Sequence, residues 1–131
     1  SNITWLPPVP KNQMADVLAA ADACVAILKP IEMYKTTYPN KVFDYMAAGR
    51  PVILVIDGVI RDVVETANAG IFCQPGNAAS LTEAVLRLSQ DPDLVRQMGL
   101  NGCSYIEKHF NRKILADNLI QLLEKLGRKN V

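Results

Sequence analysis

The chain has 131 residues, of which 50% are hydrophobic and 21% are charged, with 14 basic against 13 acidic residues and a formal net charge of +1. This length suits one domain or part of one, and it is enough to bury a hydrophobic core. The balanced charge excludes binding to nucleic acid through a broad basic surface, so we expect no nucleic-acid partner.

The three cysteines are far apart in the sequence, and no two of them have the spacing of metal ligands. Cys24 and Cys73 lie within apolar runs, so we expect both thiols to be buried and reduced. An odd number of cysteines argues against a disulfide framework and favours a cytoplasmic location. No apolar stretch reaches the length of a transmembrane helix, and the start of the chain has no signal-peptide pattern.

The first quarter of the chain predicts two strands, a helix and a loop. Residues 3–6 form a β-prone run that ends at a cluster of prolines, and Trp5 within it is expected to anchor the core. Residues 11–21 have the spacing of an amphipathic helix. Residues 23–28 are apolar and predict a short buried strand, and residues 29–38 form a mostly polar loop.

The next segment predicts a short helix with a clear start and stop. Pro39 suits the first turn of a helix, and Asn40 is an alternative cap. Gly49 stands where a left-handed residue ends a helix, and Pro51 prevents its continuation. Residues 52–56 are then largely β-branched, which favours a buried parallel strand.

Within this helix, Lys41 and Asp44 are three residues apart and therefore share one face. A cation and an acid beside the positive end of a helix can hold a phosphate and a sugar hydroxyl. The same spacing is also typical of an ordinary surface ion pair, and spacing alone favours that alternative.

Further along the chain, residues 60–67 predict a helix and residues 70–73 a last short strand. The remainder is helical. Asn77 and Asp91 are candidate caps of two helices, while Gly99 and Gly102 are expected to weaken the second of them. Asn111 is the expected cap of a final leucine-rich helix, whose apolar face we expect to pack against other elements.

The alternation of strands and helices predicts an α/β fold, a partial Rossmann-like parallel sheet of about four short strands flanked by helices, with a C-terminal helical segment. Ligands bind such sheets outside the carboxyl ends of the strands. The loop at 29–39 and the turns at 57–59 and 74–77 should therefore open on one edge of the sheet. The helix that carries Lys41 and Asp44 starts at this edge, which strengthens the interpretation of these residues as a site.

Residues 44–53, Asp-Tyr-Met-Ala-Ala-Gly-Arg-Pro-Val-Ile, are similar to the Glu-Ala-Met-Ala-x-Gly-x-Pro-Val-Ile segment of family-4 (group 1) retaining glycosyltransferases with two Rossmann-like domains. Residues 57–64, 69–72, 75–77 and 110–111 continue the resemblance in order. It implies the donor-binding half of an enzyme that uses a nucleotide sugar, without a metal or another cofactor. The pathway implied is bacterial surface-polysaccharide or aminosugar glycan synthesis.

The resemblance also implies a set of donor-binding residues. In this family two glutamates bracket the donor; Asp44 stands at the second, which binds the ribose hydroxyls, and Thr36 at the first. Glu32 is the nearest upstream acid. The segment at 38–41 resembles a subset of the family in which Lys41 and the helix N-terminus would face the diphosphate. The expected donor-binding residues are Glu32, Thr36, Thr37, Tyr38, Asn40, Lys41, Asp44 and Gly58.

Family members carry an N-terminal acceptor domain and two earlier strand–helix units, so residues 1–131 are expected to be a single partial domain without catalytic residues of its own. We expect residues 3–6 either to pair directly with the strand at 23–28 or to be completed by another molecule. The exposed edge favours a homodimer. In the intact protein the resemblance suggests a membrane-associated acceptor and a cytoplasmic position at the inner membrane.

Two other functions remain open at this point. A non-hydrolysing nucleotide-sugar epimerase shares the two-domain fold and needs histidine and acidic groups in its cleft. The one histidine, His109, lies in the helical C-terminal region, where a packing role is expected. The third interpretation is an α/β interaction module without catalytic activity, which nucleotide binding would distinguish from the first two.

Overall fold

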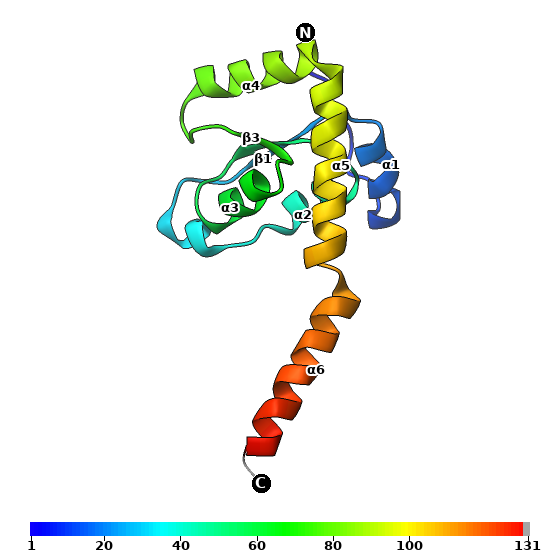
Figure 1. The fold of residues 1–131 in the computed structure, drawn as a ribbon. Helices are drawn as coiled ribbons and strands as arrows, with labels where there is room; N and C mark the ends of the chain where they lie inside the picture. Colours follow the sequence, from blue (N-terminus) through cyan, green and yellow to red (C-terminus); the bar gives the residue numbers. More distant parts are fainter. Residues whose placement is uncertain (130–131) are drawn as a thin grey trace.

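The computed structural model describes residues 1–129 and is built around a three-stranded parallel sheet (Figure 1). The strands β1 (Cys24–Ile27), β2 (Val52–Val55) and β3 (Gly70–Phe72) lie in that spatial order. Cys24 is opposite Val52, and Val52 is opposite Gly70. The predicted α/β class and parallel sheet are confirmed.

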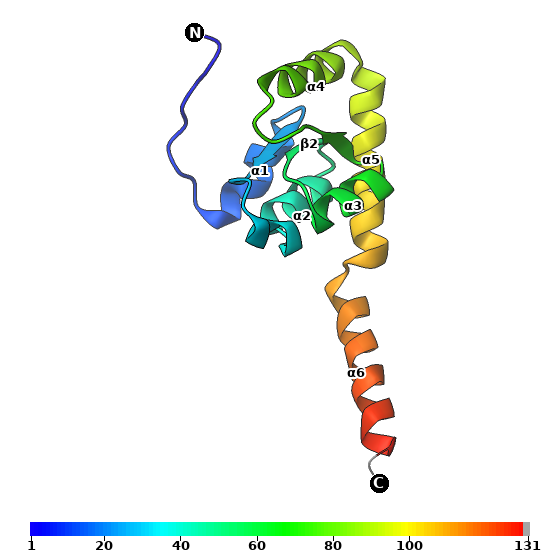
Figure 2. The ribbon, with the colours of Figure 1, turned by 90° about the vertical axis from the view of Figure 1, so that its left-hand side faces the viewer.

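The predicted strand at residues 3–6 is not formed, so the sheet has three strands rather than about four. This segment runs as extended chain away from the sheet (Figure 2), and Trp5 is 92% exposed rather than anchored in the core. The prediction of direct pairing with residues 23–28 is therefore wrong. A strand needs a hydrogen-bonded neighbour to be stable, and local β propensity does not supply one.

Helices account for most of the remaining described chain, and their capping follows the sequence. The side chain of Asn77 accepts a hydrogen bond from Ser80 N–H at 3.1 Å, and that of Asp91 accepts one from Leu94 N–H at 2.9 Å. Both predicted caps are thus confirmed. The helical elements are η1 (Lys11–Gln13), α1 (Met14–Ala19), η2 (Glu32–Thr36), α2 (Asn40–Ala47), α3 (Val59–Thr66), α4 (Ala78–Gln90), α5 (Pro92–His109) and α6 (Arg112–Lys129).

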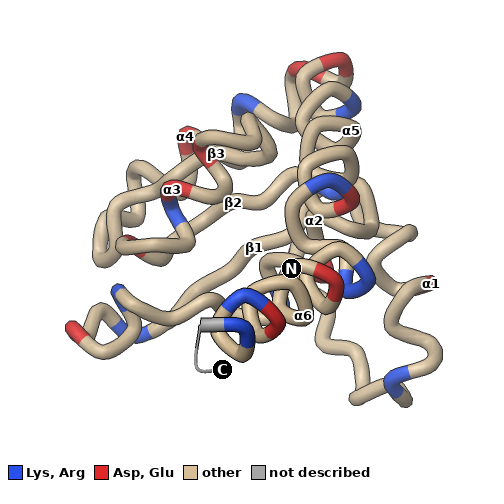
Figure 3. Tube along the Cα trace, turned by 60° about the horizontal axis from the view of Figure 1, so that its bottom comes forward, with Lys and Arg blue, Asp and Glu red and all other residues tan. Residues whose placement is uncertain are grey.

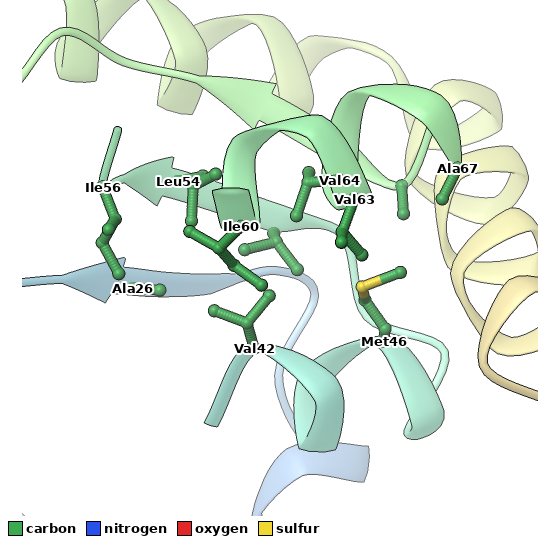
Figure 4. Close-up of a cluster of buried hydrophobic side chains, with 11 residues drawn as sticks. Ala26, Val42, Met46, Leu54, Ile56, Ile60, Val63, Val64 and Ala67 are labelled. Atoms are coloured by element: carbon green, nitrogen blue, oxygen red, sulfur yellow. The ribbon is translucent and has the colours of Figure 1, made fainter. Parts of the chain in front are cut away.

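Two apolar layers enclose the sheet because successive residues of each strand point to opposite faces. Leu54 of β2 packs with Val42 and Met46 of α2 and with residues of α3 on one face (Figure 4). Ile53 and Val55 point to the other face, where α4 covers them. Burial raises the pKa of the Cys24 and Cys73 thiols, which keeps both in the inert neutral form.

The long helix α5 passes the amino ends of β2 and β3. Gly99 and Gly102 do not interrupt it, contrary to expectation, because both glycines face neighbouring chain. A β-carbon at Gly99 would lie 2.2 Å from the Gly49 carbonyl oxygen, and one at Gly102 would lie 3.2 Å from Ala69 Cβ. α5 therefore packs closely against the chain at the amino ends of β2 and β3.

Gly99→Ala should destabilise the chain by about 1–2 kcal/mol, because the added methyl group forces α5 away from α2. Gly127→Ala in α6 is the matched control, since nothing lies within 4 Å of a β-carbon there. The control should be stabilised by up to about 1 kcal/mol from helix propensity alone. Urea denaturation of both variants measures the difference, and equal effects would contradict the close approach.

The expected packing of the final helix is not found within the described chain. α6 leads away from the sheet and the other helices (Figures 1 and 2). Its large apolar residues are exposed, and Leu119 and Leu123 are 56% and 57% exposed. The apolar period predicted the helix correctly but not its neighbours, because no other described element reaches it. No helix within residues 1–129 combines the length and apolar character needed to span a membrane.

Candidate functional site

A cavity of about 220 Å³ opens at the carboxyl ends of the three strands. Residues 28–32 and 34–35 line it after β1, residues 55–57 after β2, and residues 74–75 after β3. The sequence predicted that these three connections would meet at one edge of the sheet, and the structure confirms that placement. The cavity occupies the position where parallel α/β sheets bind ligands.

Lys35 and Glu32 form an ion pair in the lining of this cavity. The Lys35 ammonium lies 2.7 Å from Glu32 Oε1, one turn apart in η2. The hydrogen bond that Lys35 donates to Glu32 raises the pKa of Lys35, with smaller contributions from the charges of Glu32 and Asp57, so Lys35 remains a cation at neutral pH. The Glu32 side chain is 87% exposed, so its second oxygen is open to solvent and to a ligand.

Gly58 holds the η2 loop against the turn between β2 and α3. Its backbone has φ +107° and ψ −152°, a conformation that is essentially restricted to glycine. A β-carbon there would lie 2.2 Å from the Lys35 carbonyl oxygen. Gly58 does not line the cavity. Its role is to let the backbone of Lys35 approach closely, which fixes the position of Lys35 in the cavity lining.

The hydroxyl groups of Thr36 and Thr37 are used within the loop itself. Both donate to the Met33 carbonyl oxygen, at 3.1 Å and 3.2 Å. Each oxygen can still accept a hydrogen bond, but neither residue supplies the charge of the glutamate that the resemblance placed at Thr36. Tyr38 packs its ring against Phe43 of α2, with centroids 6.2 Å apart. These three residues connect the cavity to α2 rather than line it.

Lys41 lies at the carboxyl end of β1, because its ammonium donates to the Ile27 carbonyl oxygen at 2.8 Å. Asp44 is exposed one turn later on the same helix. No ion pair joins the two side chains among the interactions of residues 1–129, so the surface ion-pair alternative is wrong. Two of the three N–H groups of Lys41 remain available for a ligand.

The first turn of α2 has no side-chain cap. Pro39 is the N-cap residue, so the alternative assignment of Asn40 as the cap is wrong, and Asn40 instead begins the helix with an exposed side chain. The amide groups of the first turn are consequently free of side-chain acceptors, as at helix ends that bind anions. The helix stop at Gly49 is confirmed: its φ is +69°, and its N–H donates to the Met46 carbonyl oxygen at 3.0 Å.

A row of aromatic rings joins α2 to the end of α5. Phe43 lies 4.8 Å from Phe110, and Phe110 lies 6.1 Å from Tyr105, between ring centroids. His109 stacks on Tyr105 at 4.4 Å. The histidine is thus part of a packing cluster, as expected, and does not line the cavity that an epimerase would need it to enter.

Arg61 is already paired with two carboxylates. Its guanidinium contacts Asp57 at 3.5 Å and Glu65 at 2.9 Å, and it lies 3.8 Å from the centre of the Phe72 ring. Figure 3 shows basic and acidic residues interspersed along the chain rather than gathered by sign. No cluster of three or more His, Cys, Asp or Glu side chains with metal-binding geometry occurs in the described part of the chain.

The structure therefore sorts the predicted residues into two neighbouring groups. Glu32 lines the cavity, and Asn40, Lys41 and Asp44 lie on α2 outside its lining. Lys29, Lys35 and Gln74 also line the cavity but were absent from the predicted donor-binding residues. Lys29 and Gln74 closely follow β1 and β3, and that position was the available signal, because parallel strands bring such residues to one edge.

The comparisons with known proteins agree on one family. The family described as glycosyl transferases group 1 matches residues 1–91. The chain is 32% identical over 81 residues to an alpha-1,3/1,6-mannosyltransferase, ALG2, of Dictyostelium discoideum, covering 62% of this chain and 19% of that protein. It is 26% identical over 103 residues to a D-inositol 3-phosphate glycosyltransferase of Nocardia farcinica, covering 79% and 22%.

Two further matches extend the pattern. The chain is 30% identical over 89 residues to the amylovoran biosynthesis glycosyltransferase AmsK of Erwinia amylovora, covering 68% of this chain and 22% of that protein. Sucrose-phosphate synthase from Thermosynechococcus elongatus superimposes with a TM-score of 0.79 at 26% identity, covering 96% of this chain and 30% of that one. The chain thus spans about a fifth of the length of these curated relatives.

Proposed function

Because the chain belongs to the glycosyl transferases group 1 family, we propose that it forms the nucleotide-sugar donor-binding part of a retaining glycosyltransferase. The observation that carries the proposal is the convergence of the 220 Å³ cavity and the uncapped start of α2 at the carboxyl edge of the sheet. Pyrophosphate groups bind where a helix begins at such an edge.

The diphosphate of the donor lies at the start of α2. The free amide groups there carry the positive end of the helix dipole, and Lys41 adds a full positive charge with two unused N–H groups. Charge-assisted hydrogen bonds to phosphate oxygens are stronger than neutral ones. This arrangement neutralises the diphosphate without a metal ion or another cofactor.

The sugar hydroxyls are held by carboxylates on either side of that position. Asp44, exposed and without an ion-pair partner in the described chain, accepts hydrogen bonds from the ribose. Glu32 accepts hydrogen bonds from the donor sugar, because Thr36 cannot supply a charge and Glu32 lines the cavity. Lys35 holds the Glu32 side chain in position through their 2.7 Å contact.

In the intact enzyme, these groups would act on the leaving diphosphate during substitution at the anomeric carbon. Lys41 and the α2 amides would stabilise the charge that develops as the glycosidic bond to phosphate breaks. The acceptor would come from a separate N-terminal domain outside this chain. We place the enzyme in bacterial surface-polysaccharide or aminosugar glycan synthesis, at the cytoplasmic side of the inner membrane with a membrane-associated acceptor.

Titration of ¹⁵N-labelled protein with UDP and GDP tests binding directly. We expect amide shifts in residues 40–44 and in the cavity residues 32–35, and smaller ones with the corresponding monophosphates because fewer phosphate oxygens reach α2. The absence of shifts with either nucleotide, in this chain and in a longer protein containing it, would favour a non-catalytic interaction module.

Asp44→Asn and Lys41→Gln should each weaken nucleoside-diphosphate binding about tenfold, because each removes a charge-assisted hydrogen bond. Asp93→Asn is the matched control, since Asp93 is an exposed acid on α5, outside the site, that pairs with Arg96. It should leave Kd unchanged in isothermal titration calorimetry. Weakening by Asp93→Asn equal to that by Asp44→Asn would show that the loss of the Asp44 carboxylate does not act through this site.

A further inference from the structure

The cavity at the carboxyl ends of the strands suits one sugar ring. Its volume of about 220 Å³ lies below the range of about 300–1,000 Å³ that is usual for sites of larger organic ligands. A whole nucleotide sugar therefore does not fit, and under the proposed function the nucleotide lies at α2, outside the lining. The walls are the end of β2 and the connections that follow the three strands, so they include no residue before β1.

Both acids in the lining of this cavity already have a cation beside them. Glu32 Oε1 lies 2.7 Å from the Lys35 ammonium, and Asp57 Oδ1 lies 3.5 Å from the Arg61 guanidinium. A cation at such a distance offsets the repulsion that a carboxylate exerts on another anion. An acidic ligand therefore meets no carboxylate in this lining that lacks a cationic partner within the described chain.

Lys29 differs from the other lysines around the cavity. It also lines the cavity, two residues after the end of β1, and it forms no ion pair with a side chain of the described residues. The ammonium of Lys35 is paired with Glu32, and that of Lys41 donates to the Ile27 carbonyl oxygen. Lys29 is therefore the lysine of the lining whose charge is available to a ligand.

The neutral polar groups of the lining do not discriminate between a charged and an uncharged sugar. The Gln74 amide and the Tyr34 hydroxyl each carry a donor and an acceptor, so they can bind any sugar hydroxyl. An ammonium group has three donors and no acceptor, and its hydrogen bond to a carboxylate is roughly twice as strong as a bond between neutral groups. Selectivity for charge in this cavity therefore depends on Lys29.

We propose that the donor of this site is a nucleoside diphosphate linked to a sugar acid, and that Lys29 binds the sugar carboxylate. This assignment rests on the proposed function, because the diphosphate at α2 must bring the sugar into the cavity. Glu32 and Gln74 hold sugar hydroxyls, and Lys29 favours an acidic sugar over the neutral sugar of the same shape.

Isothermal titration calorimetry with matched donors tests this assignment, on this chain and on a longer protein that contains it. UDP, UDP-glucose and UDP-glucuronic acid share one nucleotide, and GDP, GDP-mannose and GDP-mannuronic acid share another. In the series that binds, we expect the sugar acid to have a Kd about fivefold lower than the neutral sugar, the size of an exposed charge-assisted contact. The preference should disappear at about 1 M salt, where the Debye length is about 3 Å.

Substitutions of Lys29 assign the preference to its charge. Lys29→Gln should make the two Kd values equal, Lys29→Glu should reverse the preference through like-charge repulsion, and Lys29→Arg should retain it. Lys29 is exposed, so we expect these variants to fold, and circular dichroism checks this. Lys108→Gln is the matched control, because it removes the same charge from an exposed lysine in the last turn of α5, outside the lining. It should keep the fivefold preference.

The negative results separate this assignment from the proposed function. If UDP or GDP binds but its neutral and acidic sugars have equal Kd values, the assignment is wrong and the proposed function stands. The same conclusion follows if Lys29→Gln retains the preference, because another group then recognises the carboxylate. If neither nucleoside diphosphate binds, in this chain and in the longer protein, the proposed function is wrong and the assignment is wrong with it.

Discussion

Met46→Ala should destabilise the chain by about 3 kcal/mol, within the range for removing a large buried side chain. Met46 is fully buried, and it points from α2 toward α3 in the main apolar layer (Figure 4). It also lies beneath α5, where its Cβ would be 3.3 Å from a β-carbon at Gly102. The cavity left behind cannot close without moving α2, so the helix that carries Lys41 and Asp44 should lose its position.

Urea denaturation measures the effect as a lower midpoint with an unchanged m-value. Met33→Ala is the matched control, because Met33 is a methionine of the η2 loop that is 67% exposed. It should change the free energy of unfolding by less than about 0.5 kcal/mol. Similar losses in the two variants would mean that α2 is not held to the sheet through Met46.

Gly58→Ala should destabilise the chain by about 3 kcal/mol, from backbone strain and collision together. The φ of +107° is unfavourable for any side chain, and the new methyl group would lie 2.2 Å from the Lys35 carbonyl oxygen. Because that oxygen belongs to the backbone, the whole η2 loop must move. Urea denaturation measures the stability loss, and faster hydrogen exchange at residues 32–36 should accompany it.

Gly76→Ala separates the cost of backbone strain from the cost of the collision with Lys35. Gly76 also has a positive φ, +81°, but nothing lies within 4 Å of a β-carbon there. Its substitution should cost only about 1 kcal/mol of strain. If Gly58→Ala costs no more than this control, the contact between Gly58 and Lys35 does not hold the loop. If both are mild but nucleotide binding is lost only in Gly58→Ala, the loop acts in binding without contributing to stability.

The elements that the sequence predicted correctly are those whose signals are local. α2 and β2 depend on Gly49, Pro51 and a β-branched run that act over a few residues, and the structure places both as expected. The caps at Asn77 and Asp91 are likewise formed by side chains three residues from their partners. Such features require no knowledge of distant chain.

The failed predictions of packing and strand pairing depended on distant neighbours. Residues 3–6 have the composition of a strand but no adjacent strand, and the leucines of α6 have the period of a packed helix but nothing against them. Gly99 was judged by its helix propensity, whereas its role is the close approach of α5 to Gly49. Propensity and periodicity describe a segment, but packing partners are set by the tertiary fold.

The same limit applies to the candidate site. Its location was predictable, because topology brings the ends of parallel strands together. Its hydrogen bonds were not predictable, because they depend on loop geometry that the sequence pattern does not encode. Examples are the bonds from Thr36 and Thr37 to the Met33 carbonyl oxygen and the bond from Lys41 to the Ile27 carbonyl oxygen. The cavity lining, which includes Glu32 and not Thr36, likewise depends on this loop geometry.

The ring contacts between Tyr38, Phe43 and Phe110 link α2 to the segment where α6 begins. Phe110 is the residue at which α5 ends, its ring centroid lies 4.8 Å from that of Phe43, and α6 begins two residues later at Arg112. With 18 residues, α6 is about 27 Å long. The ring contact therefore ties the starting point of this long helix to α2, which carries Lys41 and Asp44.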